Sequence, residues 1–337
     1  MMRTLALGLF FVLLRLPALA QSPLSLPFFD DFARYNNQLD PTKWEPGGGA
    51  YLNDHFSETP ISKNIVTFNG YSSDGELSFT LSPANIDSLT SRPINLGGLA
   101  ASDSVYLSFY LQTGGLGSIP QSNPIATAFF QILFKDNTGT WQEARRINPP
   151  NSGNFRPNFQ QYIIRITDAS FLHNNFQFMF RGFGRNRFSQ DTWNLDYVQL
   201  GANRRVNEQL QDVAASRRVQ PVLQRYSAMP IHQFNANIAG EINDSIYTTL
   251  NNLENNFRNI PNFTSIQVGN NSPVVSMPQT IAIPPLAKQF RTSTYAPMPG
   301  TFSGLTGFQN IKATVFITSS EAGTETLYND TISRVTA

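Results

Sequence analysis

Apolar and polar residues alternate along most of this chain, and that period of two limits what it can fold into. In residues 104–112 one face carries Val105, Leu107, Phe109 and Leu111. Such alternation is typical of a strand with one buried and one exposed side. The same pattern recurs in residues 75–82, 125–136, 160–167, 176–183 and 192–200. Together these segments predict an all-β fold, an antiparallel jelly-roll sandwich over residues 21–202.

Two long segments rich in glycine, proline, asparagine and serine, residues 113–124 and 148–158, interrupt the alternation and are expected to be loops. From residue 203 the chain becomes charged and poor in aromatic residues. We expect a connector over residues 203–230, with room for one short helical stretch.

Short alternating segments resume after the connector and fill residues 231–337. A module of about 100 residues with this strand rhythm has the size of an immunoglobulin-like sandwich. The segment has no cysteine pair and no tryptophan. The prediction of a smaller Ig-like β-sandwich therefore concerns architecture only.

The amino-terminal segment, MMRTLALGLFFVLLRLPALAQS, has the layout of a secretory signal peptide. Arg3 supplies the positive start, an apolar run follows, and Ala18-Leu19-Ala20 is a small-x-small cleavage pattern. We expect residues 1–20 to be removed and the mature chain, beginning at Gln21, to be exported to the extracellular space or the outer cell surface. No other stretch is long and apolar enough for a membrane helix.

Charge and cysteine content exclude further classes of protein. Removal of the signal peptide lowers the 24 basic residues to 22 against 23 acidic ones, a net charge of −1. A nucleic-acid-binding protein would show a basic stripe, so no nucleic-acid partner is expected. The chain has no cysteine, which excludes a lipoprotein anchor and a cysteine nucleophile.

Motifs for catalysis are absent. The three histidines, His55, His173 and His232, are far apart and not at metal-ligand spacing. The sequence contains no H-E-x-x-H, no G-x-S-x-G and no phosphate-binding loop. It also lacks the run of alternate acids on one strand that sandwich glucanases use. The sequence therefore predicts a protein that is not an enzyme.

Three acidic residues are candidates for a cation site. Asp30 and Asp31 lie on the first predicted strand, and Asp196 lies on the last strand of the same sandwich. First and last strands of a jelly roll are often neighbours, so the three carboxylates could share a structural Ca²⁺. In the alternative interpretation they accept backbone hydrogen bonds at the sheet edges.

Aromatic residues in or beside loops are candidates for ligand contact, because flat rings suit the apolar faces of sugars. Of the three tryptophans, Trp193 alternates with Leu195 and Tyr197 and is expected in the core. Trp141 follows a turn, and Phe155 lies in the predicted loop 148–158. These two residues are the predicted ligand-binding positions.

Several phrases together resemble large Bacteroidetes surface proteins that are exported by the type IX secretion system. They are LPFFDDFARYNNQLDPTKW, TFNGYSSDGELSF, DSLTSRPINLGG, FQFMFRGF, DTWNLDYVQLG and, further on, LQRYSAMPIHQF and TTLNNLENNF. The first domain also resembles MAM and concanavalin-like jelly rolls, whose closing strand often has the form W-x-[IL]-D. The resemblance implies a cell-surface location and a C-terminal sorting domain. No such domain is present, and the chain stops directly after a predicted strand, so we expect truncation at the C-terminus.

Two functions follow from these observations. The first is a non-catalytic sandwich protein that takes part in adhesion or in contact with an extracellular glycan or surface protein. The alternative is an accessory N-terminal part of a larger secreted hydrolase. A longer reading frame in the source genome would distinguish the two.

Overall fold

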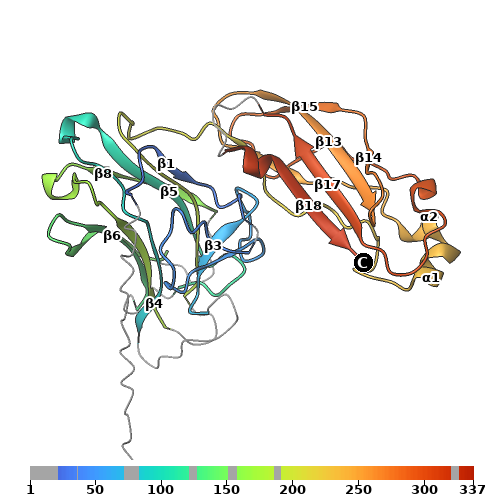
Figure 1. Ribbon diagram of the computed structural model, residues 1–337, viewed down its shortest axis with the longest axis horizontal. Helices are drawn as coiled ribbons and strands as arrows, with labels where there is room; N and C mark the ends of the chain where they lie inside the picture. Colours follow the sequence, from blue (N-terminus) through green and yellow to red (C-terminus); the bar gives the residue numbers. More distant parts are fainter. Residues whose placement is uncertain are drawn as a thin grey trace, which may run out of the picture.

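The computed structural model describes residues 22–35, 37–71, 83–120, 127–150, 158–185, 191–319 and 326–337. These residues form an all-β protein, with strands arranged in four antiparallel sheets, two in each half of the chain (Figure 1). The all-β, antiparallel prediction is confirmed. We call residues 22–201 the N-terminal sandwich and residues 213–337 the C-terminal sandwich. The finer jelly-roll and Ig-like assignments stay predictions, as do the domain boundaries.

A six-stranded and a four-stranded sheet make up the N-terminal sandwich. The six-stranded sheet has the order β2 (Tyr51–Asn53), β3 (Ile65–Phe68), β10 (Trp193–Gly201), β5 (Val105–Thr113) and β8 (Gln160–Ile166), with β1 (Phe28–Asp30) beside β10. The four-stranded sheet has the order β4 (Ala84–Thr90), β9 (Phe178–Gly184), β6 (Phe129–Lys135) and β7 (Trp141–Ile147). Two short 3₁₀ turns, η1 (Ala101–Asp103) and η2 (Ala169–Phe171), lie in the connections.

Aromatic side chains from both sheets fill the space between them. Phe109 of the six-stranded sheet contacts Phe180 of the four-stranded sheet edge to face, with ring centroids 4.9 Å apart. Phe130 packs on Trp193 at 5.5 Å, and all four of these rings are fully buried. The prediction that Trp193 belongs to the core is confirmed. The alternation of the strands therefore buries one side of each sheet.

Strand β10 is the central strand of the six-stranded sheet. It pairs with β1 through Asp30↔Val198 and with β3 and β5 elsewhere along its length. The first and last strands of the sandwich are thus neighbours, as the sequence predicted. The pairing with β5 shifts register between Asp196 and Gln199, and Tyr197 has a φ of 49°. These two features mark a β-bulge.

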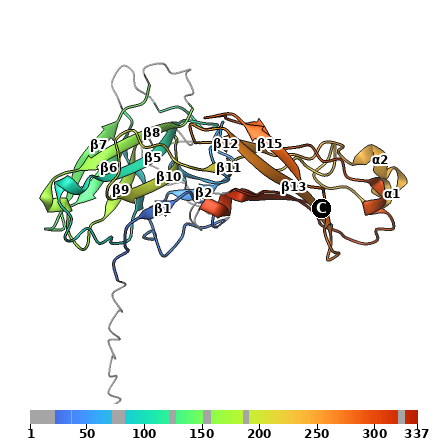
Figure 2. The ribbon, with the colours of Figure 1, turned by 90° about the horizontal axis from the view of Figure 1, so that it is seen from above.

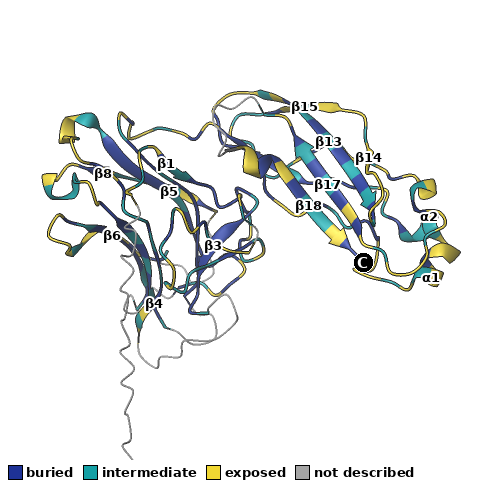
Figure 3. Ribbon diagram, in the orientation of Figure 1, coloured by how far each residue is buried: buried dark blue, intermediate teal, exposed yellow. Residues whose placement is uncertain are grey.

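The C-terminal sandwich also has two sheets. One has the order β11 (Val213–Ala215), β12 (Thr249–Asn252), β16 (Phe290–Arg291); the other has β14 (Val274–Val275), β13 (Arg258–Val268), β17 (Ile311–Ile317), β18 (Thr331–Thr336), with β15 (Gln279–Ile283) also on β13. The remaining elements are α1 (Ile231–Ala236), α2 (Ile238–Glu241), η3 (Pro299–Phe302) and η4 (Thr326–Asp330). Strands β13 and β17 alternate between buried and partly exposed residues (Figure 3).

The structure differs from the sequence prediction in two segments. Within the expected connector, Val213–Ala215 forms β11, and residues between 213 and 223 contribute buried side chains to the C-terminal core. The expected strand 326–335 begins as the 3₁₀ turn η4 and becomes a strand only at Thr331. The expected strand 75–82 lies outside the described residues. Within the described residues, no helix is long and apolar enough to cross a membrane.

The two sandwiches contact each other through a small apolar cluster and several polar contacts. The cluster joins Ile61, Ile65, Phe159 and Tyr197 of the N-terminal sandwich to Leu210, Ala214 and Leu253. Beside it, the Nδ2 of Asn251 donates to the carbonyls of Pro60 and Ile61 at 2.8 and 2.9 Å. In Figure 2, β6, β7 and β9 lie at the end of the molecule away from the C-terminal sandwich, so the outer side of their sheet is not part of this contact.

Candidate functional site

The outer side of the four-stranded sheet carries a group of large polar and aromatic side chains. Along β6, Phe130, Ile132 and Phe134 point into the core, so the intervening residues point outward. The register of β6 with β9 and β7 places their outward residues alongside. We call this surface the exposed sheet face, although Gln131 and Leu133 are themselves buried and the others are partly or fully exposed. It comprises Phe129, Gln131, Leu133, Lys135, Trp141, Glu143, Arg146, Met179, Arg181 and Phe183.

At one end of the exposed sheet face three flat groups stack across neighbouring strands. The rings of Phe129 and Phe183 lie 4.5 Å apart and within 4° of parallel. The guanidinium carbon of Arg146 lies 4.2 Å from the centroid of the Phe129 ring. Stacking of this kind restrains both the rings and the cation. The row therefore holds Arg146 in a fixed position at the surface.

A polar network continues from this row across the sheet. Arg181 donates from Nε and Nη2 to the Oε1 of Gln131 at 3.1 and 2.8 Å. The Nε2 of Gln131 in turn donates to Glu143. Arg146 donates hydrogen bonds to both carboxylate oxygens of Glu143, at distances of 2.8 to 3.2 Å. Four side chains from β6, β7 and β9 thus form one connected set of planar hydrogen-bonding groups.

Trp141 lies at the other end of the exposed sheet face, at the start of β7, and is partly exposed. Its register partner is Lys135, whose Nζ lies 5.8 Å from the tryptophan ring and donates to Gln177 at 3.0 Å. Lys135 lies six positions after Phe129 along β6, a span of about 20 Å at ~3.3 Å per position. Phe155, the second predicted ligand-binding residue, lies outside the described residues.

Glu143 and Arg181 are both charged within the network, although burial acts against the charge of Arg181. The hydrogen bonds from Arg146 lower the pKa of Glu143 below its ordinary value. Partial burial lowers the pKa of Arg181, and the Glu143 carboxylate opposes that shift. Because an arginine titrates far above neutral pH, Arg181 remains a cation. The network therefore holds one carboxylate, which Arg146 binds directly and to which Arg181 is linked through Gln131.

The three predicted cation ligands lie close to one another in the chain fold, but each has its own hydrogen-bond partners. Asp30 accepts from the amide of Phe32 at 2.9 Å and from the indole of Trp44 at 2.6 Å. Asp196 accepts from the Ser62 hydroxyl at 2.8 Å and from the amide of its neighbour at 2.7 Å. The same Ser62 hydroxyl also donates to the backbone carbonyl of Asp31. Asp30 and Asp196 thus each accept one hydrogen bond from a backbone amide, as the alternative interpretation expects, and one from a side chain.

Asp31 is involved in a contact between the two sandwiches. One of its oxygens accepts from the amide of Ala33 at 3.0 Å and the other from the Nδ2 of Asn329, in η4, at 2.9 Å. The same Nδ2 lies 3.0 Å from the Oη of Tyr197 and 2.7 Å from Asp212. Tyr197 donates to Asp212 as well. We call this group the interface cluster.

Burial dominates the titration of these acids. It raises the pKa of Asp31 to about 7, against the opposing hydrogen bonds from Ala33 and Asn329. It raises the pKa of Asp196 well above the ordinary value and also raises that of Asp30. Within the described ranges no group of three or more acidic or histidine side chains is placed to hold a metal ion. The calcium site stays a prediction, and a calcium-dependent rise in melting temperature would be needed to support it.

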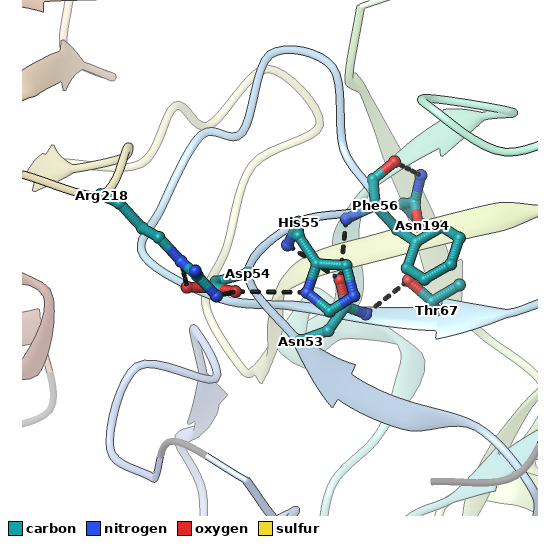
Figure 4. A network of polar contacts seen from close by, with 7 residues as sticks. All are labelled: Asn53, Asp54, His55, Phe56, Thr67, Asn194 and Arg218. Carbon is teal, nitrogen blue, oxygen red and sulfur yellow. Dashed lines mark hydrogen bonds and ion pairs between the residues drawn. The ribbon is translucent and has the colours of Figure 1, made fainter. Parts of the chain in front are cut away.

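A further polar contact between the sandwiches is shown in Figure 4. Arg218, in the segment between β11 and α1, donates from Nη2 to Asp54 at 2.6 Å, and the two form an ion pair. The residue before Asp54 is Asn53, whose Nδ2 donates to Thr67 at 2.7 Å. Thr67 in turn donates to Asn194 of β10 at 2.7 Å. Asp54 therefore directly follows Asn53, whose side chain is tied to β3 and β10 by these hydrogen bonds.

Most residues of the exposed sheet face and the interface cluster were not candidates from the sequence. Alternation in 125–136 and 176–183 separates Phe129 and Phe183 from the core positions. It does not reveal that β6 and β9 are neighbours, which is what brings the rings together. Asn329 gives no signal, because its partners lie more than a hundred residues away.

No known protein family matches the chain, and no curated protein does. Among solved structures, the K1 cleaved adhesin domain of Lys-gingipain from Porphyromonas gingivalis W83 is similar at 13% identity and a TM-score of 0.35, covering 53% of this chain and 99% of that one. The tandem CBM22-1 and CBM22-2 domains of a Paenibacillus barcinonensis protein are similar at 9% identity and a TM-score of 0.32, covering 94% and 99%. The CBM22-1 xylan-binding domain alone gives 8% identity and a TM-score of 0.31, covering 55% and 100%. The structural neighbours thus include adhesin and carbohydrate-binding domains, all at distant similarity.

Proposed function

We propose that this chain is an exported, non-catalytic glycan-binding protein of the cell surface and that the exposed sheet face is its binding surface. The observation that carries the proposal is the combination of aromatic rings and fixed hydrogen-bonding groups on one open side of a sheet. Trp141 lies at one end, the Phe129–Phe183 pair lies at the other, and the network around Gln131 lies between them. The signal-peptide pattern of residues 1–20 supports export.

The chemistry of the face suits a saccharide chain. Sugars present C–H groups on the faces of the ring and hydroxyls around the edge, so they need flat apolar contacts beside polar ones. Arg146, Arg181 and Gln131 are already held by neighbours, so little side-chain entropy is lost when a ligand binds them. A strand-long surface of about 20 Å also accommodates an extended chain.

The proposal is tested by measuring binding of the purified chain to a panel of soluble polysaccharides by affinity electrophoresis. Trp141→Ala should weaken the affinity for the bound polymer about tenfold, because loss of an aromatic side chain that anchors a ligand costs on the order of 1.4 kcal/mol or more. Phe129→Ala should also weaken it, because Arg146 loses the ring on which it lies.

A matched control exists in the C-terminal sandwich. Phe263 and Phe316 stack there at 4.8 Å and 10°, also partly exposed, on strands β13 and β17. Phe263→Ala should leave binding unchanged. Binding that is lost in Phe263→Ala but kept in Trp141→Ala and Phe129→Ala would place the site elsewhere, and a panel with no bound polymer would refute the function.

A further inference from the structure

The exposed sheet face has an excess of positive charge, from which we infer that it selects glycans that carry carboxylates, such as polymers of uronic acids. The inference rests on the proposed function and names its ligand class. The charged residues of the face are Lys135, Arg146 and Arg181 against Glu143 alone. The chain as a whole has 24 basic and 23 acidic residues, so the excess is local.

Among the described residues, Arg181 is one of two cations of this surface, with Lys135, that form no ion pair with a carboxylate. Two of its N–H groups go to the neutral amide oxygen of Gln131. Among the described residues no carboxylate lies within ion-pair distance of Arg181, and Glu143 is held on both oxygens by Arg146. A partly buried guanidinium has lost some of its hydration, and an incoming carboxylate would compensate for that loss.

The geometry also favours an anion over a neutral sugar. Arginine presents its N–H groups in a planar fork that matches both oxygens of a carboxylate, and here the fork is fixed by Gln131 and by the sheet. Arg146 is restrained by Phe129 and Glu143 on the neighbouring strands. Two oriented cations on one face offer successive contacts to a chain with an acid group on each sugar, and Lys135 adds a third beside Trp141.

The experiment compares acidic polymers with their own neutral forms. The purified chain is titrated with polygalacturonate, alginate and hyaluronate, and with the carboxyl-reduced derivative of each. We expect at least one acidic polymer to bind tenfold or more tightly than its reduced form, and raising salt from 50 to 500 mM to remove most of that preference. Arg181→Gln should weaken binding of the acidic polymer about tenfold and weaken binding of its carboxyl-reduced form by a clearly smaller factor, because only the acidic polymer loses an ion pair.

Two further variants make the result specific to this surface. Arg225→Gln makes the same change in net charge at an exposed position of the segment before α1, and should change nothing. Glu143→Gln removes the only carboxylate of the face and should tighten binding of the acidic polymer, a gain that misfolding cannot produce. Unchanged acidic binding in both Arg181→Gln and Glu143→Gln would overturn the inference.

The outcomes separate the two proposals. Equal affinity for acidic and reduced polymers, lost in Trp141→Ala, would reject the acidic ligand and keep the glycan-binding function. Absence of binding to any acidic or neutral polymer would reject both.

Discussion

At the scale of single residues, Asn329 joins the two halves of the molecule. It is fully buried, and its Nδ2 lies within 3.0 Å of oxygens of Asp31, Tyr197 and Asp212. Two of these oxygens belong to buried acids, which depend on a donor when they are removed from water. One amide group from η4 thus satisfies acceptors from the N-terminal sandwich and from the segment before β11.

We expect Asn329→Ala to lower the free energy of unfolding by about 1–3 kcal/mol, because the acids lose a buried donor. Urea unfolding followed by tryptophan fluorescence measures the change. The control is Asn270→Ala, at an exposed turn of the C-terminal sandwich, which should stay within about 0.5 kcal/mol of the parent. Equal stability of the two variants would show that the interface cluster contributes nothing.

At the scale of elements, the bulge in β10 determines which of its side chains point into the core of the N-terminal sandwich and which point toward the C-terminal sandwich. Trp193, Leu195, Val198 and Leu200 belong to the core, whereas Tyr197 belongs to the cluster between the sandwiches. An extra residue in a strand reverses the side on which the following residues point. The expectation from strict alternation that Tyr197 shares the face of Trp193 is therefore wrong. The bulge directs the phenol toward Asp212 and Asn329.

The packing of β9 against the six-stranded sheet gives a second stability prediction. Phe180 is fully buried and contacts Phe109 and Phe178 edge to face. Phe180→Ala leaves a cavity between the sheets and should destabilise the protein by about 3–5 kcal/mol in the same urea assay. Phe257→Ala is the control, because that ring is 70% exposed and makes no core contact. A cost below 1 kcal/mol at Phe180 would contradict the described packing.

At the scale of the whole molecule, the buried acids make stability depend on pH. Burial raises the pKa of Asp31 to about 7 and that of Asp87 to about 6, above their unfolded values near 4. The native state therefore holds protons that the unfolded chain has released between pH 4 and 7. Stability from these groups is fully present below pH 4 and is lost as the pH rises through 6 and 7.

We expect the free energy of unfolding to fall by a few kcal/mol between pH 4.5 and pH 7.5, measured in urea at fixed ionic strength. Asp87→Asn should reduce the fall, because an amide cannot ionise. Its oxygen can still accept from the amides of Asn69 and Gly70, which both lie 2.7 Å from one carboxylate oxygen. A stability that is constant or rises over this range would show that the acids are ionised in the folded protein.

The sequence by itself determined the class of fold, because alternation is a local property of each strand. It predicted β5, β8 and β10 nearly at their observed bounds, and placed Trp193 in the core. It also predicted that the first and last strands of the N-terminal sandwich meet. These results need only the period of the side chains and the general topology of sandwiches.

Only the tertiary structure decided which strands are neighbours and what lies between the two sandwiches. The row of Arg146, Phe129 and Phe183 exists because β7, β6 and β9 pair in one register, and no local pattern contains that register. Asp31 meets Asn329 across nearly the whole length of the chain. Contacts of this kind depend on the packing of complete sheets, so the residues that form them become recognisable only once the chain is folded.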